Sequence, residues 1–207
     1  MTVSPLWLSA EPLLLASTSA TRRALVEAAG IPIEAEDPGV DERAVEGPLR
    51  ASGTSTAEIA LHLARAKALA VSMRHPGRLV LGGDQTLACG DSAFTKTKDR
   101  AAAHDQLARL AGRTHHLHSA AALARDGAIV FDVCQSAALT MRAMDDAFIA
   151  RYLAAAGDAV LHSVGGYQLE GIGIQLFARI EGDHFTILGL PLLPVLEALR
   201  REGYLAA

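Results

Sequence analysis

Two short polar stretches constrain this chain most, because each directly follows an apolar run that reads as a buried strand. Residues 16–23 read ASTSATRR after the apolar run 13–15, and residues 82–85 read GGDQ after the apolar run 79–81. The first stretch opens a helical pattern. Its hydroxyl and guanidinium groups would therefore join the free N–H groups of a helix N-terminus, an arrangement that binds phosphate. The second supplies a carboxylate able to hold a metal ion or activate water. Together they indicate nucleotide hydrolysis.

Composition narrows the class of partner. The chain has 207 residues, 50% of them hydrophobic, and a net charge of −4 without a basic block, so we expect no nucleic-acid partner. No apolar run approaches the roughly 18 residues that span a membrane, and the first residues lack a signal-peptide pattern. Cys89 and Cys134 have no metal-ligand spacing and read as reduced thiols. We therefore expect a cytoplasmic protein with no membrane partner.

Hydrophobic periodicity predicts helices and strands that alternate early and antiparallel pairs that follow. The predicted elements are strands at 12–16, 33–36 and 78–83, helices at 21–29, 56–73, 99–110, 145–153 and 191–201, a hairpin at 87–94, paired strands at 116–124 and 128–139, and a strand pair at 174–180 and 185–188. Residues 37–56 read mainly as a loop. These elements predict an α/β fold, a mixed twisted sheet flanked by helices, in two lobes with a central cleft. We expect a single domain over residues 1–207.

Eight motifs lie in the order and spacing of the Maf family, so the chain resembles that family from about Pro12 to Tyr204. They are residues 16–23 (ASTSATRR), 41–42 (DE), 63–68 (LARAKA), 82–85 (GGDQ), Lys96, 112–115 (GRTH), 165–173 (GGYQLEGIG) and 189–192 (GLPL). Members are nucleoside triphosphate pyrophosphatases. The resemblance implies a Maf/ITPase-like fold and hydrolysis of a nucleoside triphosphate to its monophosphate and pyrophosphate, in a house-cleaning role.

The resemblance assigns the triphosphate to a set of polar and basic residues. Ser17, Ser19 and Arg22 match the family's phosphate-binding residues. The alternative is that Ser19 only caps a helix and that the arginines are solvated. Lys67, in alanine-rich surroundings that look buried, and Lys96 match two family lysines, although Thr97 stands where the family usually has proline.

The resemblance also implies a catalytic carboxylate and a divalent metal ion. Asp84 matches the family's catalytic aspartate, and Glu42 matches the acidic residue of its Asp-Glu pair. Asp84 and Glu42 would together hold Mg²⁺ or Mn²⁺, which usually takes one or two carboxylates with phosphate oxygens and water. The alternative for Glu42 is an exposed acid beside Arg43.

Three positions bear on the base. Glu170 and Gln85 match the branch of the family that resembles 7-methyl-GTP pyrophosphatases, and a carboxylate can accept the two adjacent donors of guanine. Thr21 departs from both branches, since the 7-methyl-GTP branch has tryptophan there and the dTTP and UTP branch has arginine. Trp7 could substitute for the missing ring.

Two other functions stay open. One is a dTTP and UTP pyrophosphatase of the same family, and the other is a non-catalytic nucleotide-binding regulator of cell division. Homodimers are common in such families, so a homodimer remains an expectation beside the triphosphate substrate. The histidines of the 115–118 segment read as ordinary strand residues, because no third metal ligand accompanies them.

Overall fold

A mixed seven-stranded sheet organises the protein, seen here in a computed structural model that describes residues 4–161 and 163–207. The strands run in the order β2-β1-β3-β5-β6-β7, and β4 pairs with β3. They are β1 (Leu13–Ala16), β2 (Ile33–Glu36), β3 (Val80–Cys89), β4 (Ser92–Phe94), β5 (Thr114–Arg125), β6 (Ala128–Met141) and β7 (Phe177–Glu181). The predicted α/β class with a mixed sheet is confirmed.

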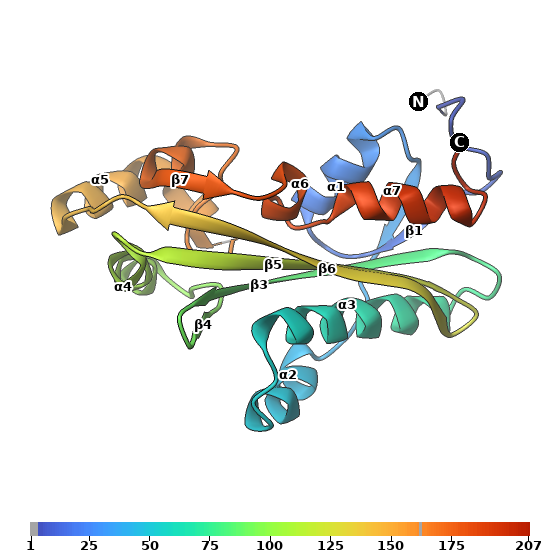
Figure 1. Cartoon of the computed structure of the whole chain (residues 1–207), viewed down its shortest axis with the longest axis horizontal. Coiled ribbons are helices and arrows are strands. Elements are labelled where there is room, and N and C mark those ends of the chain that lie inside the picture. Colours follow the sequence, from blue (N-terminus) through green and yellow to red (C-terminus); the bar gives the residue numbers. More distant parts are fainter. Residues whose placement is uncertain (1–3, 162) are drawn as a thin grey trace.

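Helices cover both faces of this sheet. They are α1 (Ala20–Ala28), α2 (Glu42–Ala51), α3 (Thr56–Ser72), α4 (Arg100–Leu110), α5 (Asp146–Ala156), α6 (His184–Ile187) and α7 (Leu192–Arg201), with 3₁₀ turns η1 (Gly157–Leu161) and η2 (Ile172–Leu176). Figure 1 shows α1 and α7 on one side of the sheet and α3 with α2 on the other. At the far end of the long β5–β6 hairpin, α4, α5 and β7 gather.

In the middle of β3, one edge of the strand pairs with no neighbouring strand among the described residues. β1 runs parallel to β3, and their register ends where Ala16 faces Gly82. β4 pairs with β3 only from Leu87 onward. Between these two partners, residues 83–86 of β3 pair with β5 alone in the described part of the chain. Asp84 therefore lies at a gap in the sheet, next to the end of β1.

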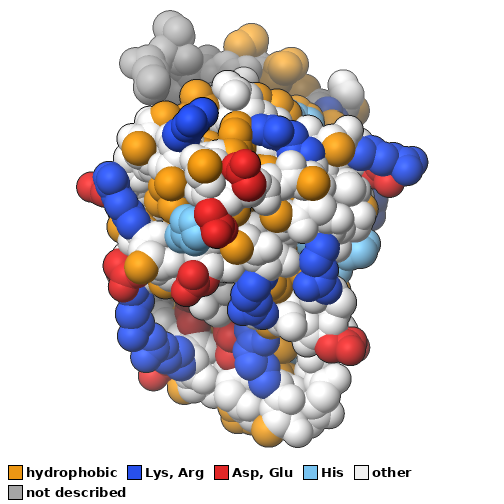
Figure 2. Space-filling view, turned by 90° about the vertical axis from the view of Figure 1, so that its left-hand side faces the viewer, with side chains coloured by type: hydrophobic (Ala, Val, Ile, Leu, Met, Phe, Trp, Pro, Cys, Tyr) orange, Lys and Arg blue, Asp and Glu red, His pale blue; other side chains and the backbone are white. Residues whose placement is uncertain are grey.

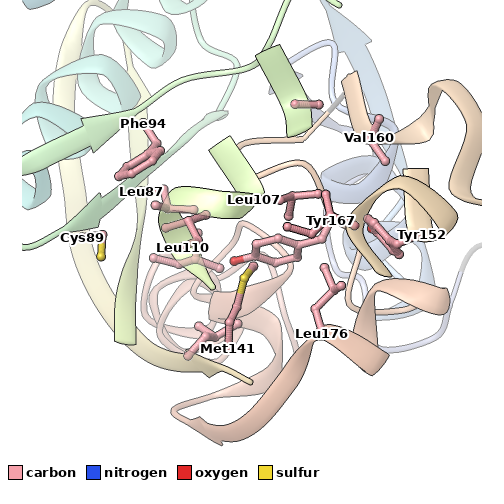
Figure 3. Packing of buried hydrophobic residues seen from close by; sticks show 14 of the residues in the cluster. Leu87, Cys89, Phe94, Leu107, Leu110, Met141, Tyr152, Val160, Tyr167 and Leu176 are labelled. Atoms are coloured by element: carbon pink, nitrogen blue, oxygen red, sulfur yellow. The ribbon is translucent and has the colours of Figure 1, made fainter. Parts of the chain in front are cut away.

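Two leucine-rich cores and an alanine-rich contact under α3 hold most of the layers together. One core lies where α1 and α7 pack on the sheet, and the other lies between α4, α5 and the far end of β5 and β6. Figure 3 shows Tyr167 in the middle of this second core, among Leu107, Leu110 and Met141. Under α3 the contact has larger, partly buried side chains at its edge and is built around six buried alanines: Ala60, Ala64, Ala68, Ala120, Ala122 and Ala124. Such small side chains bring helix and sheet backbones close together.

Three sequence-based boundaries were wrong. The predicted loop 37–56 contains α2, a helix whose half-buried Val45 and Leu49 are separated by Gly47 and Pro48, two residues that indicate a loop. The predicted strand pair at 174–180 and 185–188 does not form: residues 172–176 are the turn η2, and β7 pairs with β6. Residues 185–187 belong to the short helix α6, which Asp183 caps by accepting from the Thr186 backbone N–H at 2.7 Å. β3 was expected to end at Gly83, yet it runs on to Cys89, since its two glycines permit close packing rather than stop the strand.

Within the described residues, no helix is both long and apolar enough to cross a membrane.

Candidate active site

The residues after β1 form a small cradle of hydroxyl groups. Ser19 is the N-cap of α1, and its side chain accepts from the Arg22 backbone N–H at 3.3 Å. Ser17 is buried, and its Oγ accepts from the Ser19 backbone N–H at 3.2 Å and from a guanidinium nitrogen of Arg22 at 3.3 Å. The capping role proposed as an alternative for Ser19 is therefore present. It coexists with a direct contact between Ser17 and Arg22.

Arg22 is held on two sides rather than left in solvent. Its Nε donates to the Gly189 carbonyl at 2.8 Å. Its aliphatic part lies against β3, where a Cβ on Gly83 would come within 3.1 Å of Cδ. Burial lowers the pKa of Arg22 from its ordinary value, and the negative charges of Asp84 and Glu42 oppose that shift. The guanidinium thus shares an electrostatic environment with both predicted catalytic acids, whereas Arg23 is exposed.

A buried lysine joins the two acids. Nζ of Lys67 donates to Oδ1 of Asp84 at 2.7 Å and lies 2.6 Å from Oε1 of Glu42. Lys67 and Asp84 are each only 6% exposed, so neither charge could persist there without a partner. Glu42 is more exposed and reaches Lys67 from the first turn of α2. Asp41 does not join them, because its carboxylate caps α2.

The donor set suits a divalent cation in part. Asp84 and Glu42 both approach one point, the Lys67 ammonium, so the two carboxylates can serve a common cation with phosphate oxygens and water. Among residues 4–161 and 163–207, no group of three or more His, Cys, Asp or Glu side chains forms a candidate metal centre. A metal ion would therefore depend on the substrate for its remaining ligands.

The two glycines before Asp84 explain how this cluster is assembled. A Cβ on Gly82 would come within 2.3 Å of the Ala64 carbonyl and 2.7 Å of the Ala68 nitrogen. Gly82 therefore lets α3 lie directly on β3, which places Lys67 against Asp84. Gly83, facing the other way, makes room for Arg22. Gly82 and Gly83 thus leave space for Lys67 on one face of the sheet and for Arg22 on the other.

The remaining predicted site residues, Lys96 for the phosphates and Glu170 and Thr21 for the base, are arranged differently. Lys96 and Glu170 are exposed, and neither has a hydrogen bond or ion pair with any described residue. Thr21 is half-exposed on α1. Trp7 packs in the core against Tyr204 and donates to the Glu11 carbonyl, so it is a packed residue. Figure 2 views the α5 and β7 end, where charges of both signs are dispersed over the surface.

Gln85 faces away from Asp84, and it reveals partners that the sequence reasoning missed. Its amide nitrogen donates to Ser119 Oγ and to the carbonyls of Thr186 and Ile187. The 189–192 motif was the available signal, since it contains the Gly189 that holds Arg22. Its role becomes apparent only when the fold brings residues 22, 85 and 189 together.

The histidine segment divides between core and surface. His115 is fully buried, with Nε2 2.6 Å from the Tyr167 hydroxyl, and burial lowers its pKa to about 4. The rings of His116 and His118 stack on each other at the opposite face of β5. Burial also lowers the pKa of His118, and the neighbouring charge of His116 adds to the effect. His115 is therefore a neutral ring that packs beneath the 165–173 loop through its contact with Tyr167.

Two cavities lie away from these residues. The first, about 280 Å³, is lined by Ser72, Met73, Pro76, Asp126 and Gly127. The second, about 130 Å³, lies between residues 9–12 and 77–79 and the side chain of Tyr204. Neither cavity includes a residue predicted to serve the site.

Comparison with known proteins points to one family. The family described as Maf-like protein matches residues 12–202. A "Nucleoside triphosphate pyrophosphatase" of Rhodopseudomonas palustris (strain BisB18) is 56% identical over 202 residues, which cover 97% of this chain and 98% of that protein. A "7-methyl-GTP pyrophosphatase" of Mesorhizobium japonicum is 53% identical over 193 residues, 93% and 97% of the two chains. One of the same name from Brucella abortus biovar 1 is 52% identical over 190 residues, 92% and 96% of the two.

Proposed function

Because the chain belongs to the Maf family of nucleoside triphosphate pyrophosphatases, we propose that it hydrolyses 7-methyl-GTP to the nucleoside monophosphate and pyrophosphate. The observation that supports the chemistry best is the buried Lys67, bound to both Asp84 and Glu42 beside Arg22. The support for the base is Glu170, together with relatives at 52–53% identity that carry the 7-methyl-GTP name.

In the proposed reaction, water attacks the α-phosphorus. A new P–O bond forms to the water oxygen, the bond from the α-phosphorus to the bridging oxygen breaks, and pyrophosphate leaves. Lys67 holds Oδ1 of Asp84, so Oδ2 is the oxygen that would accept the water proton. Arg22, Lys67 and Lys96 would offset the growing negative charge on the phosphate oxygens in the transition state, and the Ser17 and Ser19 hydroxyls would donate hydrogen bonds to them.

Asp84 and Glu42 would hold a divalent cation, Mg²⁺ or Mn²⁺, which neutralises phosphate charge when bound. With substrate present, phosphate oxygens complete its shell. The ion pairs that both carboxylates form with Lys67 bring them to the same part of the site.

The proposed base contact rests on chemistry that distinguishes guanine from pyrimidines. A carboxylate at Glu170 can accept from N1–H and the exocyclic amino group of guanine together, while it repels a pyrimidine carbonyl. Methylation at N7 makes the ring cationic and adds attraction. Thr21 offers no aromatic ring for that cation, so the preference would rest on Glu170.

A second candidate is a broader triphosphatase that also accepts dTTP and UTP. It is favoured by Thr21, which lacks the ring of the 7-methyl-GTP branch, and by the 56% identical relative whose name specifies no base.

A nucleotide panel tests these proposals. Pyrophosphate release would be measured on 7-methyl-GTP, GTP, dTTP and UTP, with Mg²⁺, with Mn²⁺ and with chelator. We expect the highest kcat/KM on 7-methyl-GTP and loss of activity in chelator. A higher kcat/KM on dTTP or UTP would overturn the base assignment alone. Nucleotide binding without pyrophosphate release from any of the four would favour the non-catalytic regulator.

A further inference from the structure

Gln85 closes the C-terminal end of a short helix. Its side-chain nitrogen donates to Ser119 Oγ at 3.0 Å, to the Thr186 carbonyl at 3.2 Å and to the Ile187 carbonyl at 3.0 Å. Thr186 and Ile187 are the last residues of α6, whose carbonyls have no partner within the helix. Ser119 Oγ also donates to Thr186 at 2.6 Å. β3 and β5 thus hold the end of α6 together.

The end of α6 in turn fixes Gly189. The Gly189 backbone N–H donates to the Thr186 carbonyl at 3.1 Å, so this carbonyl accepts from Gln85, Ser119 and Gly189. The Gly189 carbonyl then accepts from Arg22 Nε at 2.8 Å. Gly189 has φ +102°, a conformation that other residues rarely adopt. Its carbonyl therefore points where the α6 end directs it.

Arg22 is clamped between this carbonyl and the strand. On the strand side, only the missing side chain of Gly83 gives it room, because a Cβ there would lie 3.1 Å from Arg22 Cδ. On the other side, Gly189 holds Nε. A shift of the α6 end would remove the Nε contact and leave the guanidinium held only by Ser17 Oγ and by its packing on the strand.

We propose that Gln85 is a positioning residue for Arg22, acting through the end of α6 and the Gly189 carbonyl. The inference rests on the proposed function, since Arg22 must bind the triphosphate. The two amide protons of Gln85 already face three acceptors within 3.2 Å, so Gln85 has no free donor for a base. Gln85 should therefore affect the binding of the phosphates, which all nucleotide substrates share, and not the choice of base.

A double-mutant cycle between Gln85 and Arg22 tests this inference. Wild type, Gln85→Met, Arg22→Ala and the double variant would be titrated with the non-hydrolysable α,β-imido analogues of GTP and UTP. We expect Gln85→Met to weaken both analogues alike, by about fivefold, the equivalent of one hydrogen bond. In the Arg22→Ala background, the same change should have no further effect.

Gln106→Met is the matched control. Gln106 is a buried glutamine, whereas Gln85 is half-buried, and the Gln106 amide fits between the Thr95 carbonyl and the Gly165 N–H, with no contact to Arg22. Its effect should add to that of Arg22→Ala. If Gln85→Met does not fold, Ser119→Ala removes a bond to the same Thr186 carbonyl, and a smaller effect of the same pattern is expected.

The possible outcomes separate the inference from the function. If Gln85→Met weakens only the guanine analogue, and still does so without Arg22, Gln85 contacts the base and the inference is overturned. If Arg22→Ala weakens binding while Gln85→Met does not, the inference is wrong and the phosphate site stands. If Arg22→Ala leaves both affinities unchanged, the proposed phosphate site fails, and the inference fails with it.

Discussion

The two ends of the site are built in different ways. At the phosphate end, Lys67 pairs with Asp84, and Arg22 is held by Ser17 and the Gly189 carbonyl, all on or next to a strand and two helices. At the base end, Glu170 is exposed, with no such contact to any described residue, and Lys96, which is expected to meet the phosphates, is exposed in the same way. Side chains that bind a part of the substrate common to all nucleotides can be held in place before binding. Binding then costs less conformational entropy. Groups on loops must be ordered by the nucleotide itself.

This contrast suits what the ends would recognise. The triphosphate is the same in every nucleotide, whereas the base is the part that differs between relatives of this enzyme. Loops tolerate substitution, because few buried contacts depend on them. We therefore expect changes at the phosphate end to affect all substrates equally, and changes at the base end to affect the ratio between substrates.

The largest effect is expected at Asp84. Asp84→Asn should reduce turnover by about 10²–10⁴-fold, the range for loss of a general base. The melting temperature should move by only a few degrees, because the shape is kept and Lys67 retains Glu42 at 2.6 Å. Pyrophosphate release and thermal unfolding check both parts. Asp132→Asn is the control, since Asp132 is paired with Arg65 outside the site and its loss should leave turnover unchanged. Near-normal turnover in Asp84→Asn would contradict the assignment.

The stability of the protein should fall at acid pH because of the buried His115. His115 stays neutral in the folded protein until about pH 4, while in the unfolded chain it takes up a proton near pH 6.5. The unfolded state therefore binds more protons between these values. The free energy of unfolding should fall by up to about 3 kcal/mol as the pH drops from 7 to 4.

The His115→Gln variant isolates this contribution. It should be less stable at neutral pH, because the Tyr167 partner is altered, yet its stability should change less between pH 7 and 4. Thermal unfolding of both proteins across this range is the measurement. Equal slopes would mean that other groups cause the acid sensitivity.

A smaller, substrate-independent effect is expected at Arg22. Arg22→Ala should weaken triphosphate binding by about 1.5–3 kcal/mol, the range for hydrogen bonds to charged groups. Titration with purine and pyrimidine analogues should give the same loss for each. A loss confined to one base would remove the distinction between the two ends.

The smallest effect is expected at Glu170. Glu170→Gln should lower kcat/KM for 7-methyl-GTP by about tenfold, in line with the loss of a charged hydrogen bond, and should raise its value for dTTP or UTP relative to 7-methyl-GTP. Thermal stability should not change, since Glu170 is exposed. Glu181→Gln, another exposed acid, serves as the control and should leave the ratio unaltered. An unchanged ratio in Glu170→Gln would show that Glu170 does not contact the base.

The sequence predicted the parts of this molecule that have a local signal. The β5–β6 hairpin follows from Asp126-Gly127, both at positive φ in the structure, and α7 begins directly after Pro191 as expected. The pairing of Lys67 with Asp84 agrees with the expectation that a buried amine finds an anionic partner. These features depend on turn chemistry and burial, which single residues reveal.

Other features have no local signal. Helix α2 has no fully buried residue, and the signals from its Asp41 cap and from Val45 and Leu49 are weakened by Gly47 and Pro48 within it. The Gln85 contacts join residues 101 and 102 positions apart, and the Arg22 contact with Gly189 spans 167. Backbone carbonyls make these contacts, and every residue type carries one. The identity of the residues therefore gives no sign of these contacts, and only the fold shows them.

The alanine-rich contact under α3 sets a size limit with mechanical consequences. At its centre, six buried alanines and Gly82 have no long side chain of their own to turn aside if a larger residue were introduced. An added methyl group at these positions would lift α3 as a rigid rod, and the Lys67 ammonium would travel with it. The distance between the backbones of α3 and the sheet thus sets the position of the Lys67 ammonium beside Asp84. Residues that never touch a nucleotide define, by their smallness, where that charge lies.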